Sequence, residues 1–295
     1  MKNKILLNIL WAFCWLLGKL PQFVQFAIAD FVCFIIYRVI GYRTKVVREN
    51  LANSFPDKTE QERKVIEKKF YRQLSDMMVE SLSLVSMTKK QVQERMVFEN
   101  PELINSLTPD RTVLTVMAHF ATWEHTVSSS LCLNAPVLAV YHPLSNKVVD
   151  EFYKKMRSRF GVQPVTMAKT SKEIVKHIRA RNYPAVALIA DQTPPVVVIK
   201  NWIPFLNQPT AFFTGMERLA VSLHTAVIFA HMSQPKRGHY RCRFELIYDG
   251  EKKLEEFELT KLYAAKLENM IVENPHLWLW SHRRWKLKPG DKIPR

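Results

Sequence analysis

The order of hydrophobic and polar residues divides the chain into an apolar N-terminal stretch, a helical segment and a longer mixed region. Apolar residues dominate positions 5–17 and 23–40, and Pro21 interrupts any helix between these two runs. From Thr59 to Leu84, hydrophobic residues recur at three- and four-residue spacing, which predicts an amphipathic helix. Thr59 with Glu62 forms a capping-box pattern, and a second helix begins in the same way at Thr88.

The remaining sequence alternates between short β-rich runs and helical stretches. The β-rich runs are 112–118, 136–141, 185–190, 225–231 and 240–248. The helical stretches are 123–133, 146–160, 171–181, 215–223 and 259–274. Strands that alternate with helices predict an α/β fold, with a central, mostly parallel sheet covered by helices on both faces. We expect one such domain over residues 43–295, behind an N-terminal membrane anchor over residues 1–42.

The anchor could lie in the membrane in more than one way. Its first apolar run is short for a span, which needs about 20 residues, and its second run contains Gln25 and Asp30. Cations flank both runs, so the positive-inside rule keeps both flanks cytoplasmic. Trp11, Phe13 and Trp15 suit a membrane interface. We therefore favour a membrane-embedded hairpin or interfacial anchor over a true span; two buried helices of a soluble protein are a third reading.

Composition narrows the possible partners. The 295 residues carry a formal net charge of +16, which favours an anionic partner such as nucleic acid, an anionic membrane, a phosphorylated lipid or an acidic carrier protein. The four cysteines are widely separated, which argues against a disulfide framework and a structural zinc site, and favours a reducing compartment. The chain lacks the glycine-rich nucleotide-binding motifs, the Gly-x-Ser-x-Gly elbow and the His-Glu-x-x-His motif. We expect no metal.

One strand end carries residues suited to acid–base chemistry. His119 directly follows the apolar run 112–118, and Glu124 lies five residues further on. Ligands of open α/β sheets bind beyond the carboxyl ends of the strands, so His119 is well placed to meet a substrate. The imidazole would take a proton from a substrate hydroxyl while Glu124 holds its other nitrogen. By spacing alone, a purely structural role for the pair is equally compatible.

The His119-x-x-x-x-Glu124 pattern resembles the H-x4-[DE] motif of the late acyltransferases of lipid A biosynthesis, the lauroyl/myristoyl transferase family. Three more segments match in order along the chain, so the resemblance runs from about residue 1 to residue 288. They are Arg43 to Pro56, Ala190-Asp191-Gln192 with the later Pro204-Phe205, and Asn274 to Lys286 with its tryptophans and His-Arg-Arg. This family resemblance implies a fold like that of the glycerolipid acyltransferases, although the Glu-Gly-Thr-Arg motif of those relatives is absent.

The resemblance also implies a reaction. A fatty acyl chain would pass from an acyl carrier protein thioester, with coenzyme A as the alternative donor, to a hydroxyl of a phosphorylated lipid A precursor, without a cofactor. His119 would be the general base and Glu124 its orienting carboxylate. An arginine on the helix after the next strand would bind the oxyanion; we favour Arg159 over Arg157.

Further residues are candidates for substrate binding through the same resemblance. Asp191 and Gln192 would lie near the site, Asp191 holding Arg159 or ordering its loop. His142 stands where many relatives have arginine. The tail from His282 to Arg295 interleaves tryptophans with cations such as Arg283 and Arg284, which suits a lipid headgroup better than single-stranded nucleic acid.

The predicted setting is the inner membrane of a Gram-negative-type bacterium, with the catalytic domain facing the cytoplasm. Two alternatives stay open. One is an acyltransferase of the same mechanism acting on another membrane lipid, an aminolipid or a glycolipid. The other is a non-catalytic membrane protein that binds anionic lipid.

Overall fold

The computed structural model describes residues 2–291 and contains a seven-stranded sheet with strand order β1-β9-β8-β2-β5-β3-β4. The five strands from β8 to β4 are mutually parallel, whereas β9 runs antiparallel to β8 and pairs in parallel with β1. The predicted mostly parallel α/β sheet is therefore confirmed. Its strands are β1 (Met96–Phe98), β2 (Val113–Met117), β3 (Val137–Tyr141), β4 (Gln163–Thr166), β5 (Ala185–Ile189), β8 (Ala226–Lys236) and β9 (His239–Tyr248). A separate antiparallel pair joins β6 (Ile203–Phe205) to β7 (Gln208–Thr210).

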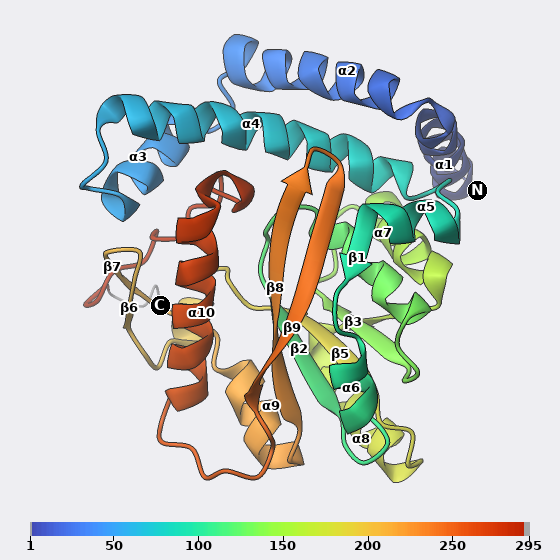
Figure 1. Ribbon diagram of the computed structural model, residues 1–295, viewed down its shortest axis with the longest axis vertical. Coiled ribbons are helices and arrows are strands. Elements are labelled where there is room, and N and C mark those ends of the chain that lie inside the picture. The colour runs from blue at the N-terminus through green and yellow to red at the C-terminus, as the bar shows by residue number, and fades with distance from the viewer. Residues whose placement is uncertain (1, 292–295) are drawn as a thin grey trace.

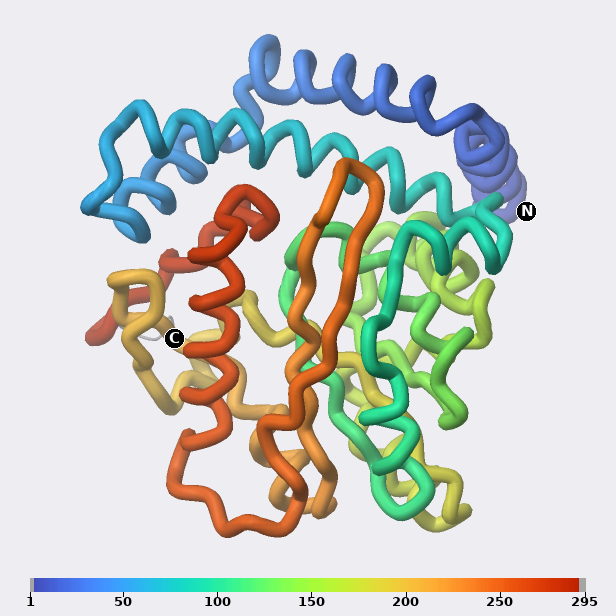
Figure 2. The backbone as a smooth tube through the Cα atoms, in the orientation of Figure 1, coloured from blue at the N-terminus to red at the C-terminus, as the bar shows by residue number. Residues whose placement is uncertain are grey.

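Helices surround this sheet, and three of them lie across one end of the molecule (Figures 1 and 2). The α-helices are α1 (Lys2–Lys19), α2 (Gln22–Cys33), α3 (Thr44–Ser54), α4 (Glu60–Ser83), α5 (Lys89–Arg95), α6 (Glu102–Leu107), α7 (Lys147–Arg157), α8 (Thr170–Arg179), α9 (Gly215–Leu223) and α10 (Glu258–Glu273). The shorter helices are η1 (Phe34–Val39), η2 (Trp123–Leu131), η3 (Ser158–Phe160), η4 (Met167–Lys169), η5 (Val196–Val198) and η6 (Pro275–Leu277). Helices α1, α2 and α4 pack together at the end toward which β8 runs (Figure 1). The carboxyl edge of the parallel strands therefore faces this helical layer.

Local sequence signals account for several of these boundaries. Thr59 caps α4 and Thr88 caps α5, each in a complete capping box with Glu62 or Gln91. All five residues of β2 are buried, as its continuous apolar run requires of a central strand. The short strands β1 and β4 were not predicted, because three or four residues carry too little periodicity.

The two N-terminal apolar runs form separate helices that meet at an elbow. Pro21 lies between α1 and α2, and α2 continues directly into the π-helix η1. The segment Gln22–Val39 is long and apolar enough to cross a membrane by length and composition, with a mean hydropathy of 1.5 and only 11% of its residues buried. Phe23, Phe31 and Phe34 are among its exposed side chains.

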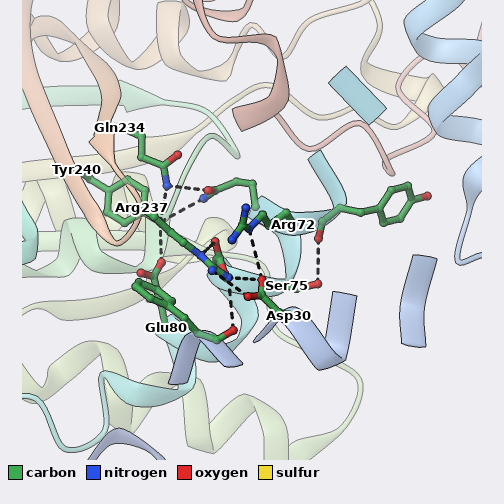
Figure 3. A network of polar contacts seen from close by, with 11 residues as sticks. Asp30, Arg72, Ser75, Glu80, Gln234, Arg237 and Tyr240 are labelled. Carbon is green, nitrogen blue, oxygen red and sulfur yellow. Dashed lines mark hydrogen bonds and ion pairs between the residues drawn. The ribbon is translucent and has the colours of Figure 1, made fainter. Parts of the chain in front are cut away.

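A partly buried polar cluster holds α2 to the rest of the protein (Figure 3). Arg237, at the turn between β8 and β9, donates to both carboxylate oxygens of Asp76 on α4, at 2.8 and 2.5 Å. The same guanidinium donates to Asp30 on α2, at 2.6 and 3.1 Å. Nearby, the Tyr240 hydroxyl donates to Glu80 at 2.6 Å. We call Asp30, Asp76, Glu80, Arg237 and Tyr240 the hairpin cluster.

Candidate active site

His119 and Asp191 meet at the carboxyl edge of the sheet. Each lies two residues beyond the end of its strand, His119 after β2 and Asp191 after β5. These strands are parallel neighbours with Met117 opposite Ile189, so both chains leave the sheet at the same level. The His119 Nδ1 atom lies 2.7 Å from Asp191 Oδ1, and the His119 backbone N–H donates to Asp191 Oδ2 at 3.1 Å.

The Asp191 carboxylate is buried and held on both oxygens. The Trp278 indole N–H donates to Asp191 Oδ2 at 2.9 Å. Burial by itself would raise the pKa of Asp191, but His119 and Trp278 outweigh it and hold that pKa below its ordinary value. An ionised Asp191 accepts a hydrogen bond from Nδ1–H, which leaves Nε2 as the basic nitrogen of a neutral imidazole.

The second nitrogen of His119 is only lightly engaged. The Gln192 side-chain amide lies 3.2 Å from His119 Nε2, and the His119 side chain keeps 19% of its surface exposed. The edge of the imidazole packs against Trp123, with ring centroids 5.0 Å apart. A substrate hydroxyl that displaced Gln192 would therefore find a positioned base.

Glu124 makes a different contact from the predicted one. It belongs to the 3₁₀-helix η2 and accepts two hydrogen bonds from Arg157, at 2.9 and 2.6 Å. Desolvation would lower the pKa of Arg157, but the pairing with Glu124 outweighs it and raises that pKa. Both Glu124 oxygens are engaged by an arginine 33 residues away, so the contact expected between Glu124 and His119 is made by Asp191 instead.

The two arginines predicted as alternative hydrogen-bond donors to the oxyanion lie in different surroundings. Arg157 lies at the C-terminal end of α7 against Glu124, with Tyr153 beneath its guanidinium at 5.3 Å from the ring centroid. Arg159 instead donates to the backbone carbonyls of Leu84 and Met87, 75 and 72 residues away in sequence. The expected contact between Asp191 and Arg159 is not among the hydrogen bonds and ion pairs of residues 2–291, where Asp191 bonds to His119 and Trp278.

The remaining candidates are dispersed. His142 is exposed, with Nδ1 3.0 Å from the Pro143 carbonyl oxygen. Arg283 is exposed, whereas Arg284 is only 2% exposed and donates to the Ala211 carbonyl at 2.6 Å. Arg284 therefore packs within the core. Of these two arginines, only Arg283 lies on the surface, where it could contact a lipid headgroup as predicted. The last four residues of that tail, 292–295, lie outside the described residues.

Sequence reasoning missed the role of Trp278 in the site. Its indole supplies a hydrogen bond to Asp191, while its backbone forms a β-bridge to Phe120, next to His119. The tryptophan pattern of the tail was the available signal, but it could not reveal a partner 87 residues away. Among the described residues, no group of three or more His, Cys, Asp or Glu side chains is placed to hold a metal ion.

This geometry suits proton transfer to and from a hydroxyl. A carboxylate that fixes Nδ1–H and leaves Nε2 accessible is the base half of a Ser-His-Asp arrangement, with the hydroxyl supplied by the substrate. Group-transfer and hydrolytic enzymes use a base and orienting carboxylate of this kind.

Comparison with known proteins identifies the family. Residues 2–287 match the family described as bacterial lipid A biosynthesis acyltransferase. The lipid A biosynthesis lauroyltransferase of Escherichia coli (strain K12) is 25% identical over 281 residues, 93% of this chain and 89% of the relative. The lipid A biosynthesis acyltransferase of Haemophilus influenzae is 24% identical over 255 residues, 85% of this chain and 80% of the relative.

A solved structure with some likeness is the 1-acyl-sn-glycerophosphate acyltransferase PlsC from Thermotoga maritima. The match covers 88% of this chain and 97% of the other, with 12% sequence identity and a TM-score of 0.39.

This chain belongs to the bacterial lipid A biosynthesis acyltransferase family, because the family match spans nearly its whole length. It is an enzyme that transfers acyl groups in lipid A biosynthesis.

Proposed function

We propose that the enzyme moves a fatty acyl chain from an acyl carrier protein thioester to a hydroxyl of a lipid A precursor, with His119 as base and Asp191 as the orienting carboxylate. The observation that carries the proposal is the 2.7 Å contact between His119 and Asp191, because Trp278 fixes the same carboxylate from its other side. Asp191 takes the orienting part that the sequence motif suggested for Glu124.

The proposed reaction keeps its protons within the site. His119 Nε2 removes the proton from the acceptor hydroxyl as its oxygen attacks the thioester carbonyl carbon. The tetrahedral oxyanion then collapses, the carbon–sulfur bond breaks, and His119 returns the proton to the departing thiolate. The products are an ester and the free carrier thiol. Asp191 keeps the imidazole in the correct tautomer and offsets its positive charge during the step.

An oxyanion needs a fixed donor, and we assign Arg157 in preference to Arg159. Arg157 uses its Nε and Nη2 atoms on Glu124, which leaves Nη1 for a substrate. Arg159 spends both terminal nitrogens on backbone carbonyls. Glu124 is accordingly proposed to position Arg157 rather than the base.

The proposed donor is an acidic carrier protein, with coenzyme A as the alternative. The formal net charge of +16 favours an acidic partner. Helix α8 adds a local reason, since Lys172, Lys176 and Arg179 are exposed on it and it follows the edge strand β4. Its carboxylate Glu173 already pairs with Lys176 at 3.8 Å.

The proposed location is the cytoplasmic face of an inner membrane, with α1 and α2 lying in the membrane interface as a hairpin. Exposed apolar side chains on both helices, such as Phe13 and Phe31, support contact with lipid. The hairpin cluster favours an in-plane position over a span, since crossing would draw the Asp30–Arg237 pair into hydrocarbon. The carboxyl edge of the sheet faces this layer, which suits an acceptor that stays in the membrane (Figure 1).

Mass spectrometry of lipid A tests the proposal. Cells that lack the protein should lose one acyl mass, and wild type should restore it. His119→Ala should fail to restore it, whereas His224→Asn, a change at an exposed histidine at the end of α9, should succeed. An unchanged lipid A in the deletion would contradict this acceptor and favour another membrane lipid. Restoration by His119→Ala would contradict the mechanism and favour a non-catalytic lipid-binding role.

A further inference from the structure

A pocket of about 340 Å³ lies at the elbow between α1 and α2, separate from the residues around His119. Helix α5 and the first residue of β9 complete its walls. The charged and polar side chains that matter for its chemistry are Lys19, Gln22, Glu94, Arg95 and His239. We call this site the elbow pocket.

The elbow has a fixed shape. A Cβ atom on Gly18 would lie 2.3 Å from the Ser86 hydroxyl oxygen, so only glycine allows α1 to approach this closely. The buried Gln25 side chain donates to the Leu20 carbonyl at 2.8 Å and accepts from the Ser83 hydroxyl at 3.0 Å. These contacts tie the end of α1 and the start of α2 to the end of α4, and they preform the pocket wall.

The elbow pocket holds donors that are not used within the described part of the protein. The Gln22 Nε2 and Arg95 Nη1 atoms are buried and have no hydrogen-bond partner among residues 2–291. A buried donor without a partner costs free energy, and a charged one costs more. Gln22 is also the first residue of α2, where backbone N–H groups have no partner within the helix and the helix dipole favours an anion.

The charge of the pocket favours an anion. Lys19 and Arg95 contribute two cations to the wall, and the carboxylate in the wall, Glu94, already pairs with Lys90 at 3.9 Å. Arg95 also interacts with the buried Glu80, whose pKa burial raises to about 7 and whose Oε1 atom has no hydrogen-bond partner among residues 2–291. A ligand with several acceptor oxygens and a negative charge would satisfy both free donors.

Exposed apolar side chains around the elbow pocket indicate that the anion is part of a lipid. Leu16, Leu20 and Phe23 flank the elbow and are 61%, 38% and 74% exposed. An inorganic ion would leave this apolar rim in water, whereas a phospholipid would cover it with its acyl chains. We propose that the elbow pocket binds the phosphate of a membrane phospholipid headgroup and thereby fixes the N-terminal hairpin at the membrane surface.

The proposal does not rest on the reaction assigned to His119, and its test reads binding instead of turnover. Full-length protein in detergent is titrated with a short-chain phosphatidylglycerol, and bound lipid is counted by native mass spectrometry. Lys19→Gln and Gln22→Ala should each weaken binding, about tenfold for the charged residue. Lys89→Gln is the matched control, because it removes an exposed cation from the same helix as Arg95 and lies outside the pocket wall. It should stay within about twofold of wild type.

Three further arms make the outcome decisive. His119→Ala should bind the lipid like wild type, which separates this site from the catalytic one. Inorganic phosphate should compete only weakly; competition as strong as that of the lipid would overturn the lipid assignment. Equal losses in Lys19→Gln and Lys89→Gln would show diffuse surface attraction and overturn the site. Circular dichroism of each variant verifies folding before titration.

Discussion

The surroundings of His119 and the hairpin cluster both bury carboxylates beside nitrogen bases, yet they differ in how accessible the paired groups are: His119 is partly exposed, whereas Glu80 is buried and its Oε1 atom has no hydrogen-bond partner among residues 2–291. In the hairpin cluster, Arg237 spends its donors on Asp30 and Asp76 (Figure 3). At His119, Asp191 engages the Nδ1 atom, whereas the Nε2 atom meets only the neutral side-chain amide of Gln192. Burial of charge alone therefore does not mark a site; a base that is positioned by a carboxylate and accessible from solvent does.

The pKa shifts of the buried carboxyl groups also distinguish the two regions. The hydrogen bonds to Asp191 overcome its burial and lower its pKa, so it stays ionised as a partner for imidazole. Burial dominates at Asp76 and Glu80 and raises both pKa values, in spite of Arg237 and Tyr240. The catalytic carboxylate is thus held ionised by the groups around it. Asp76 and Glu80 are buried where they hold helices together, whereas the exposed Asp30 of the same cluster has its pKa lowered by the hydrogen bond from Arg237.

The largest expected effect is on turnover. His119→Ala should lower kcat by about 10²–10⁴-fold, because it removes the general base. Thermal stability should change little, since His119 lies at the edge of the sheet and is partly exposed. Steady-state acyl transfer and a melting curve on the same sample would separate these effects. A large loss of stability with normal turnover per folded molecule would place His119 with the structural residues.

The converse substitution should act on stability. Arg237→Met leaves the buried Asp76 without its cation, whereas the exposed Asp30 keeps its pair with Arg72. Removal of one partner from a buried pair costs about 3–5 kcal/mol, and the partial exposure of Arg237 places the expected loss at about 3 kcal/mol. Denaturant unfolding in detergent measures this loss. Arg241→Met is the control, because its pair with Glu99 is exposed and should contribute at most about 1 kcal/mol. Equal effects of the two variants would refute the structural role of the hairpin cluster.

The pH dependence of stability should carry a signature of Glu80. Its folded-state pKa of about 7 exceeds its ordinary 4.5, so the folded protein binds the extra proton between these values. The free energy of unfolding should therefore fall as pH rises from about 4.5 to 7, by at most about 3 kcal/mol. Glu80→Gln should remove this slope and be the more stable protein at pH 8. The free energy of unfolding of both proteins should be measured from pH 5 to 8. The same dependence on pH in wild type and in Glu80→Gln would contradict the prediction.

A smaller effect is expected at Trp278. Trp278→Phe keeps most of the packing but removes the hydrogen bond to Asp191. A hydrogen bond to an ionised carboxylate contributes about 1.5–3 kcal/mol, so kcat should fall by about ten- to a hundredfold. The pH–rate profile should shift with it, because a less constrained Asp191 fixes the imidazole less well. An unchanged profile with only a lower melting temperature would mean that Trp278 acts through packing alone.

Sequence patterns predicted the parts of this molecule that depend on local chemistry. Both capping boxes and the bounds of α9 agree with the structure, because their signals lie within a few residues. The pair of His119 with Asp191 depends on β5 lying beside β2, and strand order is not encoded locally. Glu124 illustrates the opposite case: its short spacing from His119 suggested a contact, but Arg157 from α7 occupies both of its oxygens.

The most direct test of the account is the acyl-transfer rate of Asp191→Asn beside that of Glu124→Gln, with donor thioester and acceptor supplied to purified protein. Loss of the orienting carboxylate should lower kcat of Asp191→Asn by about 10²–10⁴-fold and alter its pH–rate profile. Glu124→Gln, which can still accept one hydrogen bond from Arg157, should keep the wild-type profile with a smaller loss of rate. A near wild-type Asp191→Asn, with the profile altered in Glu124→Gln instead, would contradict the assignment of Asp191 to His119.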